Sequence, residues 1–285
     1  MSEDVTLHCA DGQALAGQFF AAPEAPQRLP VLLSPATGVP QAFYRRFCLW
    51  LAAQGHAVLV FDYRGIGRSL QGDVRHSPAR LQDWGALDQA AAIDWLRQRC
   101  GVPRVLLLGH SAGGQLMGLL PDREALAGVV AVAGSTGWLG GMPWRFRPVA
   151  WWFLKCWLPL SVRWSGAGRC KAVGQGEDLP RGVALQWAAW CSRPGYAVNA
   201  PGGEAVRQGH EALRCSLTVL HASDDPIATA ANVEDLLRRF PNARRRSEQL
   251  RPQDFGYAQL GHIDLFRASR ERVWPRIAQA LQAAA

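Results

Sequence analysis

The chain has 285 residues, of which 48% are hydrophobic, so it can bury one large core and does not have the composition of a disordered protein. Its formal net charge is +8, but 29 of its 31 basic residues are arginines, and these are scattered along the sequence. A protein that binds nucleic acid would be expected to gather its cations into a stripe with aromatic neighbours, so no nucleic-acid partner is expected.

The chain opens with an acidic segment and two short β-prone stretches. Residues 1–5 lack the basic region and apolar run of a secretory signal, so we expect a cytoplasmic protein. Asp11 and Gly12 separate the stretches 5–8 and 14–20, and an Asp-Gly pair favours the tight turn of a hairpin. Two antiparallel strands are therefore predicted at the start of the chain.

Five short apolar runs follow, and helical patterns separate them. The runs are 29–33, 57–61, 105–108, 128–133 and 217–221, and the helical patterns are 41–54, 81–99, 111–120 and 230–240. Each run is typical of a strand that is buried on both faces of a parallel sheet. The alternation predicts an α/β fold, with a mostly parallel central sheet and helices on both faces. Ligand sites in such sheets lie beyond the carboxyl ends of the strands.

The interval between residues 134 and 214 interrupts this alternation. It contains eight of the twelve tryptophans and no clear strand, and segments rich in glycine and proline bound it. We interpret residues 135–213 as an inserted helical cap, or lid, and residues 1–134 and 214–285 as the core domain. Trp138 and Trp187 are predicted to line an apolar substrate pocket, although packing of the cap onto the core explains the tryptophans equally well.

A basic and aromatic stretch in this interval has a second interpretation. Arg145 and Arg147 precede the tryptophans of residues 151–157, a pattern that also occurs in segments lying on a membrane surface. The most apolar part, residues 149–160, is too short to span a bilayer and contains Lys155. We expect no membrane partner by default and keep association with a membrane surface as the alternative.

The strongest functional signal is the sequence GHSAG at residues 109–113, which follows the third apolar run directly. In this G-x-S-x-G pattern a serine sits on a sharp turn between a strand and a helix, where side chains at the two glycine positions would collide with neighbouring backbone. Ser111 is therefore the candidate nucleophile. The N–H of Ala112, at the start of the predicted helix, is a candidate donor to a developing oxyanion. His110 is predicted to contact the substrate.

A second oxyanion donor is expected from the loop after the first central run, residues 34–38. Pro35 has no N–H to donate, so the donor is Ala36 or Thr37, and we favour Ala36. Thr37 is also predicted to contact the substrate.

A serine hydroxyl is a poor nucleophile without a base, and the base must be oriented by an acid. Two adjacent carboxylates, Asp224 and Asp225, follow the last apolar run. We favour Asp225, which immediately precedes a proline, and keep Asp224 as the alternative. Of the seven histidines, only His262 lies downstream of these carboxylates. The order serine, aspartate, histidine along the chain therefore selects His262 as the base.

These segments together resemble the α/β-hydrolase superfamily over nearly the whole chain. The resemblance rests on GHSAGG at 109–114, FDYRGIGRS at 61–69, the Asp225-Pro226 turn and the Gly261-His262 pair. Residues 34–40 and 43–47 also resemble a bacterial group of uncharacterised α/β hydrolases. The resemblance implies that Ser111 is the nucleophile, His262 the base, Asp225 its orienting acid, and the loop around Ala36 part of the oxyanion hole. The chain departs from many relatives by having Ser34-Pro35 in place of a His-Gly pair.

The resulting hypothesis is a serine hydrolase that cleaves a carboxylic ester or thioester with an apolar acyl or alcohol part through an acyl-enzyme. A peptidase or acyltransferase with the same triad, or a non-catalytic ligand-binding protein of the same fold, is the alternative. The substrate is the only small-molecule partner expected. No cofactor or metal is expected, because the cysteines form no C-x-x-C pair and the G-x-G at Gly65 and Gly67 has Leu70 where a dinucleotide loop has its third glycine. We interpret that segment as a structural loop.

Overall fold

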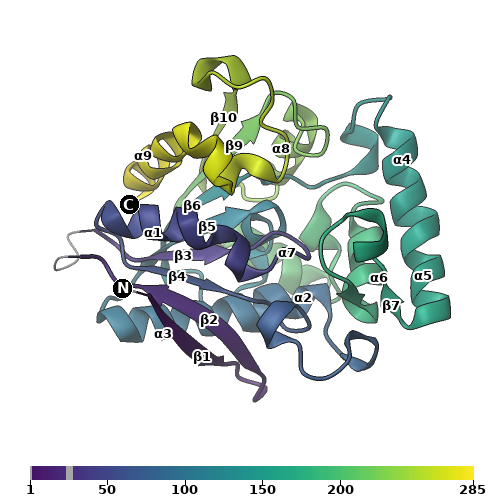
Figure 1. Ribbon diagram of the computed structural model, residues 1–285, viewed down its shortest axis with the longest axis horizontal. Coiled ribbons are helices and arrows are strands. Elements are labelled where there is room, and N and C mark those ends of the chain that lie inside the picture. Colours follow the sequence, from purple (N-terminus) through teal and green to yellow (C-terminus); the bar gives the residue numbers. More distant parts are fainter. Residues whose placement is uncertain (1, 24–27) are drawn as a thin grey trace.

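A computed structural model describes residues 2–23 and 28–285 of the chain (Figure 1). Its main sheet contains β1 (Ser2–His8), β2 (Ala14–Phe20), β3 (Val31–Ser34), β4 (Val58–Phe61), β5 (Val105–His110), β6 (Leu126–Val132), β9 (Ser216–Ala222) and β10 (Arg244–Leu250). These eight strands lie in the order β1-β2-β4-β3-β5-β6-β9-β10. β2 is antiparallel to both of its neighbours, and the strands from β4 to β10 are parallel.

Helices cover both faces of this sheet. The α-helices are α1 (Arg45–Ala53), α2 (Leu81–Asp83), α3 (Ala90–Cys100), α4 (Arg147–Trp152), α5 (Leu158–Ser165), α6 (Arg181–Trp190), α7 (Glu204–Glu211), α8 (Ala230–Leu237) and α9 (Trp274–Ala284). α1 and α9 lie over one face, and α3 lies over the other (Figure 1). Between them, Leu32, Leu59 and Leu107 of the central strands are fully buried. The predicted architecture, a mostly parallel sheet with helices on both faces, is confirmed.

The predicted strands form close to their expected positions, and one further strand of the main sheet was not predicted. The five apolar runs become β3, β4, β5, β6 and β9, and the two β-prone stretches become the hairpin β1–β2. The edge strand β10 has the sequence RRRSEQL, and most of its residues are exposed. It therefore lacks the apolar run that marks a buried strand, and its pairing with β9 is a tertiary contact.

The predicted helix over residues 111–120 is wrong. This segment forms two short 3-10 turns, η5 (Ser111–Gly114) and η6 (Met117–Leu119). The Gln115 N–H bonds to the Ala112 carbonyl, three residues back, and so closes the first turn. Glycines have low helix propensity, and three of them, at positions 113, 114 and 118, lie in this stretch. The N–H of Ala112 therefore belongs to a 3-10 turn and not to the N-terminus of an α-helix.

The tryptophan-rich interval forms a layer of helices beside the sheet. α4 and α5 are joined by a π-helical turn, η8 (Phe153–Trp157), and run along the outer edge of the molecule with α6 inside them (Figure 1). A short strand pair, β7 (Ala167–Gly168) and β8 (Leu179–Pro180), also forms here, although no strand was predicted. α7 lies within the predicted cap, residues 135–213, but it packs against η6 of the core. We propose that the cap begins near residue 135 but ends before α7.

No helix among residues 2–23 and 28–285 combines the length and the apolar character needed to cross a membrane.

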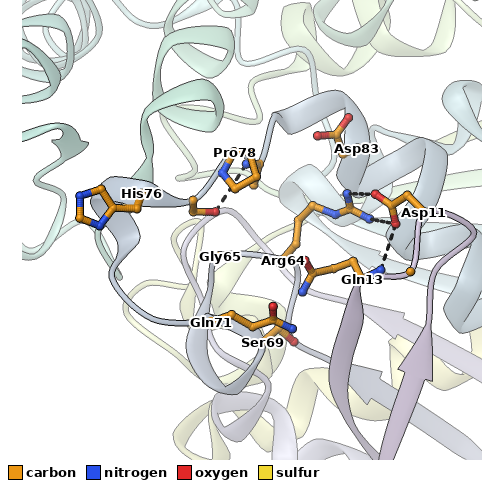
Figure 2. A pocket seen from close by; sticks show the side chains of 12 residues that line it. Asp11, Gln13, Arg64, Gly65, Ser69, Gln71, His76, Pro78 and Asp83 are labelled. Atoms are coloured by element: carbon orange, nitrogen blue, oxygen red, sulfur yellow. Dashed lines mark hydrogen bonds and ion pairs between the residues drawn. The ribbon is translucent and has the colours of Figure 1, made fainter.

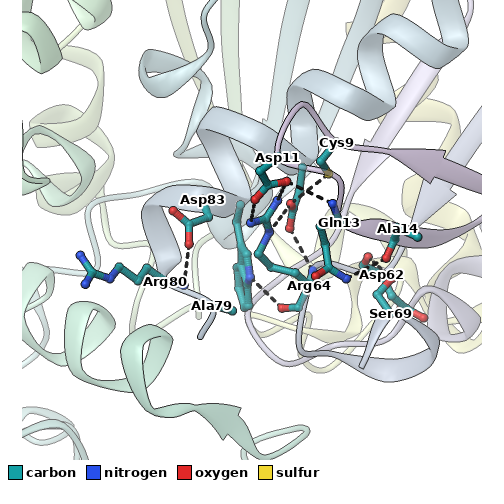
Figure 3. Close-up of polar contacts among 12 residues, drawn as sticks. Cys9, Asp11, Gln13, Ala14, Asp62, Arg64, Ser69, Ala79, Arg80 and Asp83 are labelled. Atoms are coloured by element: carbon teal, nitrogen blue, oxygen red, sulfur yellow. Dashed lines mark hydrogen bonds and ion pairs between the residues drawn. The ribbon is translucent and has the colours of Figure 1, made fainter. Parts of the chain in front are cut away.

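Buried charges hold the loop at residues 62–69 against the N-terminal hairpin (Figure 3). The Arg64 guanidinium donates to Asp88 at 2.6 Å and to Asp11 at 2.7 Å. The Asp88 side chain is fully buried, and this burial raises its pKa to about 6 in spite of the neighbouring Arg64. The Arg64 backbone N–H also donates to Asp88, at 2.9 Å. These contacts are those of a structural loop.

Replacing Arg64 with leucine is expected to lower the free energy of unfolding by about 3–5 kcal/mol, because the Asp88 carboxylate would stay buried without its partner. Urea unfolding at equilibrium measures this loss. Arg68→Leu is the matched control, since Arg68 pairs with Asp4 in an exposed salt bridge worth about 0–1 kcal/mol. Equal losses of unfolding free energy in the two variants would contradict a stabilising role of the buried pair between Arg64 and Asp88.

Candidate active site

Ser111 lies at the end of β5, where the chain turns sharply from the strand into η5. Its φ is +48°, in the left-handed region that residues other than glycine rarely adopt. The flanking glycines leave room for this turn. A Cβ atom on Gly109 would lie 2.2 Å from the backbone N of Gly114, and one on Gly113 would lie 2.0 Å from the Ser34 carbonyl oxygen. The turn has the strained geometry expected of a nucleophile elbow.

His262 lies in the loop between β10 and α9 and contacts two of the predicted site residues. Its Nε2 is 2.9 Å from Ser111 Oγ, and its Nδ1 is 2.7 Å from Asp225 Oδ2. Both distances are within hydrogen-bonding range. Ser111 and Asp225 follow the carboxyl ends of the parallel strands β5 and β9, which is the edge of the sheet where a site is expected. The three side chains therefore form one continuous hydrogen-bonded chain.

The Asp225 carboxylate is buried and uses both of its oxygens. Oδ1 accepts the backbone N–H groups of Ile227 at 2.8 Å and Ala228 at 2.9 Å, which leaves Oδ2 for His262. Burial alone raises the pKa of Asp225, but the His262 ring and the two backbone donors outweigh burial and lower the pKa below its ordinary value. Asp225 is thus ionised at neutral pH and can hold the hydrogen of His262 on Nδ1.

The neighbouring Asp224 has different partners. Its exposed carboxylate accepts the backbone N–H groups of Leu260 at 2.9 Å and Gly261 at 3.2 Å. Asp224 therefore fastens the backbone directly before His262, whereas the imidazole itself contacts Asp225. Of the two carboxylates that the sequence left open, Asp225 is the one that contacts the imidazole of His262.

A sequence model of the Alpha/beta hydrolase family matches residues 31–275, most of the chain. The chain belongs to the α/β-hydrolase family. This hydrolase is 27% identical, over 233 residues, to the "Putative carbamate hydrolase RutD" of Variovorax paradoxus (strain S110), in an alignment that covers 78% of this chain and 79% of the relative.

Solved structures of other proteins share the fold of this hydrolase. A thermophilic esterase from Thermogutta terrifontis superposes with a TM-score of 0.59 at 18% identity, covering 99% of both chains. The Pyrococcus furiosus esterase Pf2001 superposes with a TM-score of 0.63 at 16% identity, covering 100% of this chain and 93% of that one. At these identities the similarity establishes the fold alone.

The backbone after Ser111, the candidate nucleophile of this hydrolase, adjoins the predicted oxyanion loop. Gly113 lies against the carbonyl of Ser34, at the end of β3, and the buried Gln89 side chain donates to both the Ser34 hydroxyl and the Gly113 carbonyl, each at 2.8 Å. Ala112 is in the first turn of η5, where backbone N–H groups have no partner within the turn. No acceptor for its N–H is found among the described residues, and its role as an oxyanion donor stays a prediction.

The second predicted donor, Ala36, has a partner already. Its N–H donates to the Tyr44 hydroxyl at 2.9 Å, so this hydrogen is not free for a substrate oxygen, which argues against the role predicted for it. The Thr37 N–H, the alternative from the sequence, has no acceptor in the part of the chain that the structure describes. The geometry therefore favours Thr37 over Ala36.

His110 is fully buried, and a contact of its ring with the substrate stays a prediction. Its Nε2 donates to the carbonyl oxygen of His262 at 3.0 Å, and its Nδ1 then accepts from the Tyr44 hydroxyl at 2.8 Å. Burial lowers the pKa of His110 to about 3, so the ring is neutral, as these bonds require. A series of hydrogen bonds from Ala36 through Tyr44 and His110 connects the predicted oxyanion loop to the backbone of His262. Sequence reasoning missed Tyr44, for which the only signal was its place in the resembling segment 43–47.

Trp138 and Trp187, both partly buried, make contacts typical of packing. Trp187 in α6 packs edge-on against Phe153 of η8, with ring centroids 5.6 Å apart. The carbonyl of Trp138 accepts from the Asn232 side chain at 3.1 Å, which ties its loop to α8. Packing is the interpretation that the sequence left open beside a substrate pocket. A contact of either ring with the substrate stays a prediction.

A polar hollow lies between the N-terminal hairpin turn and the loops at residues 64–71 and 76–79 (Figure 2). Arg64 and Asp11, which line it, are already paired with each other. Ser111, Asp225 and His262 do not line this hollow, so it is not a candidate active site.

Proposed function

We propose that this α/β hydrolase is a serine hydrolase that cleaves a carboxylic ester or thioester with an apolar acyl or alcohol part. One observation carries the proposal: the hydrogen-bonded chain from Ser111 Oγ through His262 to Asp225. A nucleophile, a base within hydrogen-bonding reach and an ionised group that orients the base are the parts that acyl transfer needs.

In the proposed mechanism, His262 Nε2 takes the proton of Ser111 as Oγ attacks the acyl carbonyl. The ionised Asp225 stabilises the imidazolium that results. The backbone N–H groups of Ala112 and Thr37 donate to the oxyanion, in a site where these donors are already oriented before reaction. His262 then protonates the leaving alcohol or thiol, and water hydrolyses the acyl-enzyme by the same steps.

A carbamate is the second candidate substrate, because the relative with 27% identity over most of both chains carries the name "Putative carbamate hydrolase RutD". The attack on the carbonyl is the same, but the nitrogen beside a carbamate carbonyl makes that carbon a weaker electrophile. Comparing kcat/KM for a matched ester, thioester and carbamate, with the same alkyl group, ranks the three classes.

Intact-mass labelling with a fluorophosphonate tests whether Ser111 is activated. We expect one adduct on the wild-type protein and none on Ser111→Ala, because the phosphonate reacts with a serine that has a base beside it. Ser223→Ala is the matched control, since Ser223 is an exposed serine next to the Asp224-Asp225 turn and should leave labelling unchanged.

Absence of an adduct on a folded wild-type protein would favour a non-catalytic ligand-binding protein on this fold. If labelling succeeds, adding an alcohol or amine with the ester distinguishes an acyltransferase, which would form the transfer product in excess of hydrolysis. A peptide substrate tests the peptidase alternative in the same way.

A further inference from the structure

Six large apolar side chains are exposed on the outer edge of the cap, although burial would be favourable for each. Trp144 is 73% exposed and Trp164 is 63% exposed. We call the set the tryptophan face: Trp144, Val149, Trp151, Trp152, Leu160 and Trp164. Among the described residues, the other exposed large apolar side chains are Leu49 and Leu185. Such a concentration of exposed apolar groups marks an interaction surface.

The tryptophan face lies mainly along one helix. α4, η8 and α5 form an unbroken helical stretch from 147 to 165, which lies at the outer edge of the molecule (Figure 1). Its inward side chains recur every four positions and are buried: Ala150, Leu154, Leu158 and Val162. Trp157 stacks on Trp152 at 5.6 Å and contacts Trp164 edge-on at 5.8 Å, so the aromatic rings continue along the helix. The helix is amphipathic, and its outward side is exposed.

Cations without acidic partners are interleaved with these rings. Four of them are Arg145, Arg147, Lys155 and Arg163, and none forms an ion pair with another described residue. The sequence has no aspartate or glutamate between Glu124 and Glu177. The Arg145 guanidinium lies 5.0 Å from the ring centre of Trp144. The surface is therefore both apolar and uniformly positive.

We propose that the tryptophan face binds the surface of an anionic lipid bilayer, with the helix at 147–165 lying in the plane of that surface. Indole rings favour the boundary between acyl chains and headgroups, because they join a large apolar body to a polar N–H. Arginine and lysine beside them are attracted to anionic headgroups. This surface belongs to the cap, which follows the carboxyl end of β6, so docking would bring an ester dissolved in the bilayer near the edge of the sheet that holds Ser111.

A second copy of the chain is a weaker occupant. A two-fold symmetric dimer through this face would set the same cations of each copy against those of the other, and like charges across an interface repel. An anionic bilayer matches both the charge and the aromatic character of the face. The inference concerns binding and does not depend on the proposed catalytic activity.

Flotation with lipid vesicles tests the inference on the full chain. We expect the protein to float with vesicles of phosphatidylcholine mixed with phosphatidylglycerol, and to bind vesicles of phosphatidylcholine alone at least about tenfold more weakly. Added salt should weaken binding to the anionic vesicles. Ser111→Ala should bind like the wild type, which separates a failure of this inference from a failure of the catalytic proposal.

Two variants address the two components of the face, and matched controls address general effects. Trp144→Ser/Trp164→Ser removes apolar area, and Arg145→Glu/Arg163→Glu reverses charge; each should lower the vesicle partition coefficient roughly tenfold or more. The controls are Leu49→Ser, which removes an exposed apolar residue of α1, and Arg104→Glu/Arg214→Glu, which reverses charge just before β5 and β9, at the opposite edge of the sheet. All these residues are exposed, so urea unfolding should show unchanged stability.

Absence of binding to anionic vesicles by the wild type would overturn the inference. Equal losses in the controls and in the face variants would also overturn it, since binding would then follow net charge alone. A dimer of the wild type that becomes a monomer in Trp144→Ser/Trp164→Ser, without vesicle binding, would identify a second copy as the occupant instead.

Discussion

Alanine at Ser111 or at His262 should lower kcat/KM for an activated ester by about 10⁴-fold or more. Without Ser111 there is no nucleophile 2.9 Å from the base, and without His262 the serine keeps its proton. The double variant should be no worse than either single variant by more than about tenfold, because the three residues act as a unit.

Activity is measured as the hydrolysis of a p-nitrophenyl ester. A separate urea titration of each variant checks that it is folded under the assay conditions. His76→Ala and Ser223→Ala remove an exposed histidine and an exposed serine, and both should keep wild-type activity. Turnover close to that of the wild type in either folded active-site variant would rule out the proposed triad.

Asparagine at position 225 should also cost about 10⁴-fold in kcat. The Asp225 Oδ1 atom accepts two backbone N–H groups, so the carbonyl oxygen of an asparagine would take that position and its NH₂ would face His262 Nδ1. Nδ1 would then have to accept a hydrogen bond, and the ring hydrogen would move to Nε2. A protonated Nε2 in the neutral ring cannot take the proton of Ser111.

Asp224→Asn is the matched comparison for this prediction. Asp224 bonds only to backbone before the base, at Leu260 and Gly261, and the carbonyl oxygen of an asparagine can accept these N–H groups as well. We expect a loss of about tenfold or less. Measuring kcat for both variants on one ester decides between the carboxylates, and a larger loss at Asp224 would reverse the assignment of the orienting acid.

The central part of the fold could be predicted because its signals are local. The buried strands are marked by continuous apolar runs, and the turn around Ser111 by glycines that no other residue could replace without collision. The proximity of Ser111, Asp225 and His262 followed from chain order and from the rule that sites lie at the carboxyl ends of parallel strands. Their catalytic roles remain predictions.

The parts that could not be predicted depend on contacts between distant residues. β10 is a strand because β9 offers it an edge, although its own sequence is charged and mostly exposed. The partner of the Ala36 N–H is the hydroxyl of Tyr44, and that hydroxyl is placed by His110, which lies 66 positions later in the chain. Tertiary structure, and not local propensity, decides such bonds.

Two short turns, η5 and η6, follow Ser111 where a long helix was predicted, and residues much later in the sequence pack against the second of them. α7 packs against η6, where the His210 ring occupies the space beside Gly118; Arg123, just before β6, donates to the Gly118 carbonyl at 3.1 Å. Contacts between segments so far apart in sequence close a long loop and form slowly. During synthesis, the turn at Ser111 therefore emerges well before α7, and also before Asp225 and His262, so the proposed hydrogen-bonded chain can form only after residue 262 has been made.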